Sequence, residues 1–373
     1  MAEQRGQPIA VLFGTRPEVI KLAPVILELR ARGAPTVVVA TGQHRELVDD
    51  LLELFGIGVD AQLGLMRPRQ SIDHVLAGAV TLMGRALDRY RPAAVVVQGD
   101  TTSALGAALS AFHRHLRLAH VEAGLRSHDL ELPFPEELNR RVVSLVARWH
   151  FAPTEAAAEN LRREGVTGEV CVTGNTVVDA MQLIAARGVP LSTGLASFIG
   201  AGPLLLATAH RRESWSGGIA AIAGALSDVL DATPALRLVF VTHPNPVARR
   251  PVEKALGRHE RARVIDAVLY SEFIALLRRA TLVVSDSGGV QEEGPTLGVP
   301  VLVTRSVTER PEGLAAGAVR LVGTDRAMIR DTTVALLGDE AARRQMSNAG
   351  RTIYGDGNAA KRIVDVLLGK AAC

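Results

Sequence analysis

The sequence predicts an α/β protein with two doubly wound domains that face a cleft. Short apolar runs rich in β-branched residues alternate with segments of helical periodicity, and this rhythm occurs twice along the 373 residues. The apolar runs show no polar alternation, which is typical of parallel strands buried on both faces. At roughly 150 residues per domain, the length also favours two domains.

The first series contains four expected strands, each followed by a polar turn. They span residues 9–13, 36–40, 93–98 and 116–121. Apolar residues at helical spacing follow the first three, so we expect helices through about residue 32, through residue 55 and from residue 103. This alternation favours right-handed crossovers and a parallel sheet with helices on both faces.

The second series repeats the pattern after a linker. Residues 188–202 are rich in Gly, Pro and Ser and predict a connection with a short helix. The strands expected after it span residues 203–207, 236–242, 281–285 and 299–303. We therefore expect one domain over residues 1–180 and a second over residues 181–354. By its own residues, the last helix, about 358–368, fits either domain.

Composition and charge narrow the class of protein. Hydrophobic residues make up 47% and charged residues 22%, as in soluble globular proteins. The net charge is only +3, and no run of Lys or Arg suits nucleic acid or an anionic membrane. Apolar runs of about five residues are shorter than the ~20 of a membrane span or the ~7 of a signal-peptide core. We expect a soluble, cytoplasmic protein with no nucleic-acid or membrane partner.

The sequence predicts neither a metal nor a redox cofactor. Cys171 and Cys373 lie far apart in the chain, which predicts no disulfide framework and no Cys-based metal site. The His and carboxylate residues lack metal-ligand spacing. The patterns G-x-G-x-x-G, G-x-x-x-x-G-K-[ST] and G-x-S-x-G are absent after the expected strands, so a dinucleotide fingerprint, a P-loop and a nucleophile elbow are not indicated.

Polar clusters follow the expected strands at the ends where open α/β sheets bind ligands. In the segment GTRPE, residues 14–18, Arg16 lies beside a helix start, and Lys21 follows in the next turn. Two cations there suit an anion, although both could simply be solvated. Asp100 and Glu122 end two later strands, where a carboxylate facing a cleft is costly unless it is hydrogen-bonded or used.

A third acidic group begins the segment PEELNR, residues 135–140. Pro135 is typical of a helix start, so Glu136 and Arg140 become neighbours on one helix face. Glu136 in the first turn could equally be a residue that stabilises the helix dipole.

The second half offers a candidate phosphate site in the segment DSGGVQEE, residues 286–293. Its glycines permit close approach, and the backbone N–H groups of residues 287–290 would point outward at a helix start. Glu293 would then accept hydrogen bonds from ribose hydroxyls. A plain helix cap with a glycine turn is the alternative. His210 and His243 each follow an expected strand, and either could be an ordinary loop histidine.

Taken together and in order over residues 9–355, these motifs resemble the non-hydrolysing UDP-N-acetylglucosamine 2-epimerases. The resemblance is carried by residues 14–18 with Lys21, 43–45, 69–70, 99–101, 120–126, 135–140, 172–176, 210–213, His243, 245–246, 286–293 and 308–312. It implies two Rossmann-like domains in a glycosyltransferase-B-like arrangement, with the terminal helix, about residues 355–373, returning to the first domain.

The resemblance also implies roles for individual residues. Those matching the catalytic group are Asp100, Glu122, Glu136, Arg140 and His210. Those matching substrate contacts are Arg16, Lys21, Ser287, Gly288, Gly289 and Arg310, with Glu293 at the ribose and Phe273 near the uracil. Those matching a second, activating UDP-N-acetylglucosamine are Gln43, Glu46, Arg69, Arg211 and His243.

The reaction implied by the resemblance needs no cofactor and no metal. Such enzymes eliminate UDP in the anti sense, hold a 2-acetamidoglucal, and add UDP back in the syn sense with the proton on the other face. They are generally homodimers. The fold leaves open a hydrolysing epimerase that releases N-acetylmannosamine and UDP, a glycosyltransferase, and a non-catalytic sugar-nucleotide sensor. The sequence does not assign each carboxylate to a sugar face.

Overall fold

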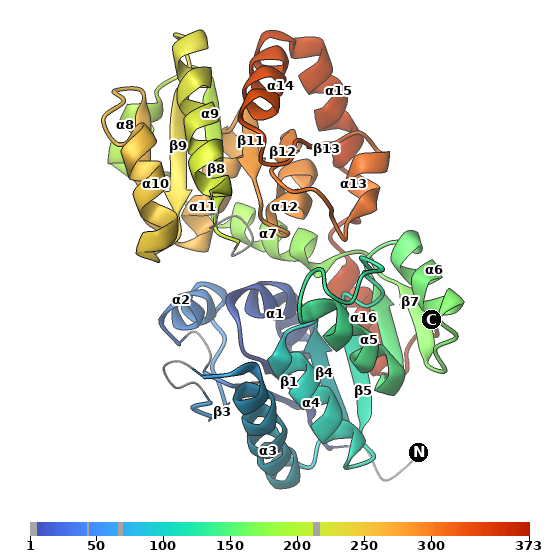
Figure 1. Cartoon of the computed structure of the whole chain (residues 1–373). Helices are drawn as coiled ribbons and strands as arrows, with labels where there is room; N and C mark the ends of the chain where they lie inside the picture. The colour runs from blue at the N-terminus through green and yellow to red at the C-terminus, as the bar shows by residue number, and fades with distance from the viewer. Residues whose placement is uncertain (1–5, 43–44, 66–69, 212–216) are drawn as a thin grey trace. The chain divides into compact units, whose positions relative to one another are not determined.

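A computed structural model describes residues 6–42, 45–65, 70–211 and 217–373 (Figure 1). The chain forms two α/β units, one of Met1–Leu183 with Tyr354–Cys373 and one of Ile184–Ile353. The boundaries expected from the sequence were residues 180 and 355. The terminal helix belongs to the first unit.

The first unit is built on a parallel sheet whose strand order is β3-β2-β1-β4-β5-β6-β7. Its strands are β1 (Ile9–Phe13), β2 (Thr36–Ala40), β3 (Ala61–Gln62), β4 (Ala94–Gln98), β5 (Arg117–Val121), β6 (Trp149–Ala152) and β7 (Glu169–Val172). The chain runs outward from β1 to β3 and then crosses back to β4. The strand order therefore reverses between β1 and β4, which is where open sheets of this kind bind ligands.

Helices cover both faces of this sheet. They are α1 (Arg16–Ala31), α2 (Arg45–Phe55), α3 (Ile72–Tyr90), α4 (Thr102–Phe112), α5 (Glu136–Val146), α6 (Glu155–Arg163), α7 (Thr176–Ala186) and α16 (Ala359–Leu367). On one face α4 packs between α3 and α5, and on the other α1 packs against α2 and α16 (Figure 1). Alternate residues of β1, such as Ala10 and Leu12, join the core under α3 and α4.

The second unit repeats this plan with the strand order β10-β9-β8-β11-β12-β13, again parallel. Its strands are β8 (Leu204–Ala209), β9 (Arg237–Thr242), β10 (Ala262–Ile265), β11 (Leu282–Ser285), β12 (Val301–Val303) and β13 (Val319–Leu321). Its helices are α8 (Thr193–Ile199), α9 (Gly218–Ala232), α10 (Pro246–Leu256), α11 (Tyr270–Arg279), α12 (Val290–Thr296), α13 (Pro311–Ala315), α14 (Arg326–Gly338) and α15 (Glu340–Gly350). Here the order reverses between β8 and β11.

One expectation about the cysteines is wrong. Cys171 of β7 and Cys373 form a disulfide, with their Cα atoms 4.7 Å apart. The sequence separation of 202 residues gave no hint of this pairing. The reason is that α16 packs on α1, which returns the end of the chain to the first unit.

The contacts of α16 fix it to the first unit. Asp179 accepts the backbone N–H groups of Ala359 and Ala360 at 3.3 and 2.9 Å. Arg32 pairs with Asp365 at 3.1 Å.

Among the helices that the structure describes, none has the length and apolar character needed to cross a bilayer.

Candidate active site

The turns after the neighbouring strands β4 and β5 place two carboxylates at the carboxyl edge of the first sheet. Gln98 is the register partner of Val121, and the N–H of Gly99 donates to the carbonyl oxygen of Val121 at 3.1 Å. Asp100 follows one of these strands and Glu122 the other. Glu122 has a φ of 62°, a left-handed conformation that is costly for a residue other than glycine.

Glu122 is a buried carboxylate surrounded by donors. The ammonium of Lys21 and the amide of Gln98 both donate to it in short contacts. Asn175 adds an amide N–H at 3.3 Å. Lys21 is itself buried, so this is an ion pair inside the protein with further hydrogen bonds on the acid.

Asp100 has a different partner, Arg140 of α5. The Arg140 guanidinium donates to Asp100 in a short contact and lies 3.4 Å from Glu137 on its other side. Asn139 donates its amide to the carbonyl oxygen of Asp100 at 2.9 Å. The first turn of α5 therefore holds the turn after β4. Glu136, the expected neighbour of Arg140, is the first residue of this helix and is half-buried.

The turn after β1 completes the group in the first unit. Arg16 begins α1, and Lys21 projects from the same helix to Glu122. Glu18, which is 1% exposed, accepts the backbone N–H groups of Gly14 and Thr15. Since β1 and β4 flank the point where the strand order reverses, this cationic turn adjoins the turn of Asp100.

In the second unit, the turns after β8 and β11 are joined by Asp286. This fully buried carboxylate accepts the backbone N–H of His210 at 2.9 Å and that of Arg211 at 2.9 Å. The imidazole Nδ1 of His210 lies 3.4 Å from it. These two strands again flank the reversal of strand order, so both sheets have their polar turns at equivalent places.

Two guanidinium groups flank the glycine turn of residues 287–289. A Cβ on Gly288 would lie 3.0 Å from Nη1 of Arg310 and 3.4 Å from Nη2 of Arg211. Arg310 is held by Glu292 and Glu309. Burial alone would raise the pKa of Glu309, but Arg310, Arg305 and Arg211 together bring it below its usual value. A bare backbone turn between two arginines is suited to a phosphate or diphosphate.

Glu293 is hydrogen-bonded to α11, the helix that carries Phe273. The hydroxyl of Tyr270 donates to Oε1 of Glu293 at 2.7 Å. Phe273 is half-buried on the same helix as Tyr270.

His243 follows β9, and its Nδ1 accepts the backbone N–H of Asn245 at 3.0 Å.

The residues matched to the activator are only partly covered. Gln43 and Arg69 lie outside the described residues, as does the side chain of Glu46. Arg211 and His243 both lie in the second unit, where Arg211 adjoins Gly288.

Several polar partners were not singled out from the sequence. Gln98, Asn139 and Asn175 donate to the candidate acids or their turns, and Tyr270 donates to Glu293. The available signal was weak: Gln98 is a polar residue at the end of an apolar strand, and Asn139 follows the acidic pair of the α5 start.

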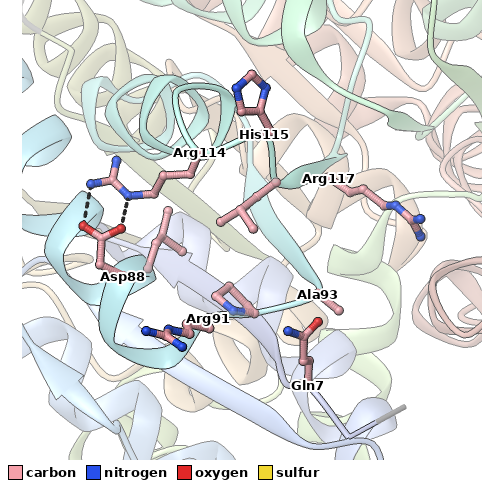
Figure 2. Close-up of a pocket in the computed structure, with 10 residues that line it drawn as sticks. Gln7, Asp88, Arg91, Ala93, Arg114, His115 and Arg117 are labelled. Atoms are coloured by element: carbon pink, nitrogen blue, oxygen red, sulfur yellow. Dashed lines mark hydrogen bonds and ion pairs between the residues drawn. The ribbon is translucent and has the colours of Figure 1, made fainter. Parts of the chain in front are cut away.

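A cavity of 530 Å³ lies at the opposite edge of the first sheet (Figure 2). It is lined by residues near the amino ends of β4 and β5, among them Arg91 and Arg117. Asp88 forms two hydrogen bonds with Arg114 there, at 2.7 and 2.8 Å. The candidate acids are at the other edge, so this cavity is separate from them.

In the described ranges, no three His, Cys, Asp or Glu side chains gather as metal ligands.

Comparison with known proteins supplies a family. The family model described as UDP-N-acetylglucosamine 2-epimerase matches residues 27–368. The chain is 40% identical over 369 residues to the UDP-N-acetylglucosamine 2-epimerase of Neisseria meningitidis serogroup A, covering 96% of this chain and 99% of that one. It is 41% identical over 369 residues to the enzyme of that name from Escherichia coli K12, covering 96% and 98%.

Solved structures agree with this similarity. The crystal structure of the N. meningitidis UDP-GlcNAc 2-epimerase bound to UDP-GlcNAc aligns with a TM-score of 0.91 at 39% identity. The alignment covers 97% of this chain and 100% of that one. A spinosyn rhamnosyltransferase aligns with a TM-score of 0.60 at 15% identity over 96% of this chain and 100% of the other, a likeness of fold alone. The expected fold class, two Rossmann-like domains of the glycosyltransferase-B type, is confirmed.

Proposed function

The chain belongs to the UDP-N-acetylglucosamine 2-epimerase family, and from that premise we propose that it interconverts UDP-N-acetylglucosamine and UDP-N-acetylmannosamine without hydrolysis. In the proposed reaction a base removes the C2 proton, the C1–O bond breaks, and UDP leaves with the bonding electron pair. The bound 2-acetamidoglucal then takes a proton at C2 on the other face while the UDP oxygen re-forms the bond to C1. Atoms balance without water or a redox partner.

The observation that supports this mechanism most directly is the pair of acids on neighbouring strands. Glu122 and Asp100 have separate cationic partners, Lys21 and Arg140. Proton removal on one face and delivery on the other requires two acid/base groups, and two independently held carboxylates suit that requirement. Glu136 and His210 are proposed as further members of the catalytic group.

The second unit is proposed to bind the UDP portion. Arg310 lies against the turn of Ser287, Gly288 and Gly289, and would stabilise the charge on the departing diphosphate. Glu293 would bind the ribose and Phe273 would lie near the uracil. Arg16 and Lys21 of the first unit are proposed as further substrate contacts. The solved structure of the N. meningitidis relative is bound to UDP-GlcNAc, and that of S. aureus MnaA contains UDP.

The experiment that tests the reaction is incubation with UDP-N-acetylglucosamine alone in heavy water, followed by NMR. We expect UDP-N-acetylmannosamine to form, with deuterium at C2 in both sugar nucleotides. Free N-acetylmannosamine accumulating with an equal amount of UDP would instead identify a hydrolysing enzyme. No change until an acceptor is added would identify a transferase, and tight binding without turnover a sensor.

Regulation and assembly complete the proposal. We infer a second UDP-N-acetylglucosamine as activator, bound by Gln43, Glu46, Arg69, Arg211 and His243, from the resemblance to bacterial enzymes. Arg69→Ala should then abolish sigmoidal kinetics. A homodimer and a cytoplasmic location belong to the same proposal, and sedimentation and cell fractionation test them.

A further inference from the structure

We propose that Glu18 is a positioning residue that fixes the turn carrying Arg16 to the turn carrying Asp100. This role rests on the proposed function, because it gives Glu18 a part in that reaction without contact to the substrate. The two turns lie on either side of the reversal of strand order, so their separation sets the shape of the first unit's half of the site.

Glu18 bridges two strand ends that are far apart in the sequence. Its Oε2 accepts the backbone N–H of Gly14 at 3.0 Å and that of Thr15 at 2.6 Å. Its Oε1 accepts the hydroxyl of Thr101 at 2.9 Å, across 83 residues of chain. Thr101 directly follows Asp100. One side chain therefore links the β1 turn to the β4 turn.

The same two turns are closely packed. A Cβ on Gly14 would lie 2.5 Å from Oγ1 of Thr41 and 2.6 Å from Oγ of Ser103. Ser103 belongs to the first turn of α4, just after Thr101. The turn after β1 thus already touches the start of α4, and the hydrogen bonds of Glu18 act across a short and well-defined distance.

Burying this carboxylate has a cost in stability. Burial raises the pKa of Glu18 above its usual value, although hydrogen bonds from Thr15, Gly14 and Thr101 oppose the rise. A folded-state pKa above the unfolded one means that ionised Glu18 weakens folding once the pH exceeds its unfolded pKa. A buried acceptor held at such a cost favours a role in function over one in stability alone.

The test compares Glu18→Ala and Glu18→Gln with the parental enzyme in steady-state epimerisation. Glutamine keeps an oxygen for the two backbone donors, and its amide can donate to Thr101. We expect Glu18→Ala to lower kcat about tenfold or more with a smaller change in KM, because misplaced acids slow the chemical step. Glu18→Gln should stay within about threefold of the parental kcat, since it preserves the geometry.

Asp179→Ala is the matched control. Asp179 is also a buried carboxylate that accepts two backbone N–H groups, and burial raises its pKa as well. It lies on α7 and binds the first residues of α16, and among the described residues its hydrogen bonds go to neither of the two turns that Glu18 links. Its loss should lower the melting temperature and leave kcat of the folded enzyme unchanged.

Amide hydrogen exchange provides a readout that does not need turnover. Glu18→Ala should speed exchange in residues 14–16 and 99–102, and Asp179→Ala should not. Unchanged exchange in both turns, or a kcat within about twofold of parental, would overturn the role. So would a Glu18→Gln enzyme as slow as Glu18→Ala, which would assign the effect to charge.

A second pair covers the case in which Glu18→Ala does not fold. Thr101→Val removes the hydroxyl bound by Glu18, and Thr101→Ser retains it. Equal kcat values for this pair would refute the link between the turns. A parental chain that does not convert UDP-N-acetylglucosamine would refute the proposed function instead, and the exchange comparison would still judge Glu18.

Discussion

The backbone and the side chain of the candidate acid Glu122 are both constrained. Its left-handed backbone, with φ of 62°, costs about 1 kcal/mol or more for a residue with a side chain. Three donors then hold the carboxylate in one place: Lys21, Gln98 and Asn175. A carboxylate fixed in this way needs little rearrangement when it accepts a proton.

Replacing either candidate acid by its amide should therefore stop most of the turnover. Glu122→Gln and Asp100→Asn keep the shape of the side chain and remove its proton-transfer capacity, so each should lower kcat by ~10²-fold or more. The rate is measured at saturating UDP-N-acetylglucosamine. Glu169→Gln, which alters an exposed carboxylate of β7, is the control that should keep full activity. Near-parental rates in both test variants would place the acid/base chemistry elsewhere.

Two buried histidines give the chain a predictable response to acid. His120 and His150 are register partners on β5 and β6. Burial lowers the pKa of His120 to about 4 and that of His150 to about 3. Neither nitrogen of His150 has a hydrogen-bond partner in the part of the chain that the structure describes. Both rings are therefore neutral in the folded protein at pH 7.

Stability should fall as the pH drops from about 6.5 toward 4. The unfolded chain binds protons on these histidines at about pH 6.5 while the folded chain does not, so acid favours unfolding by ~2 kcal/mol per histidine at about pH 5. Urea unfolding at several pH values measures this. His150→Leu should make the pH dependence less steep between these values, and an unchanged slope would contradict the neutral state of His150.

Among the elements, the turn between β11 and α12 requires a residue without a side chain at position 288. A Cβ at Gly288 would lie 3.0 Å from the guanidinium of Arg310 and 3.4 Å from that of Arg211. Gly288→Ala should therefore displace Arg310 and raise Kd for UDP about tenfold, the loss expected from one impaired charged contact. Calorimetry measures this Kd. Gly194→Ala in α8, where a Cβ meets nothing within 4 Å, should bind UDP as before.

The inner strands were predictable from the sequence, and the outer ones were not. Strands β1 and β2 coincide with the expected residues, since each is a short apolar run with β-branched residues that is bounded by turn residues. The outer strands β3, β6 and β7 were not expected. The first has two residues, and β6 includes the polar His150, so neither shows a strong pattern.

The positions of the candidate acids and of their cationic partners were predictable from the sequence, and the neutral amides that also donate to them were not. A carboxylate directly after a buried strand can be located from the chain alone, and Asp100 and Glu122 were found in this way. Their donors come from other strands and helices, so Gln98 and Asn175 gain meaning only when the sheet is assembled. The catalytic and activator roles assigned to individual residues stay predictions.

At the scale of the whole molecule, the fold and the family were both predictable from the sequence. Only the family says which reaction the chain is expected to catalyse. The family is confirmed by 40% identity to an enzyme of that name over almost the entire chain. The fold is shared with a rhamnosyltransferase at 15% identity, so architecture alone does not choose between epimerase and transferase. The choice depends on the side chains at the carboxyl edges of the two sheets.

The disulfide between Cys171 and Cys373 links distant parts of the chain, with 202 residues of sequence separation. A crosslink across so long a loop stabilises the folded state by about 2–4 kcal/mol. We expect the melting temperature of the oxidised parental protein to fall by several degrees on reduction, and that of Cys373→Ser to be insensitive to reductant. The same melting temperature for parental protein with and without reductant would contradict a stabilising role.

The interrupted course of the first unit has a consequence for biosynthesis. Its last helix, α16, emerges from the ribosome only after all of Ile184–Ile353 has been made. Until then, the amino-terminal portion cannot complete its fold, because the surface of α1 that contacts α16 stays uncovered. The intervening unit is continuous in sequence and can fold as soon as it has been made. A chain truncated after Ile353 should thus contain one finished unit and one whose α1 surface remains open to chaperones.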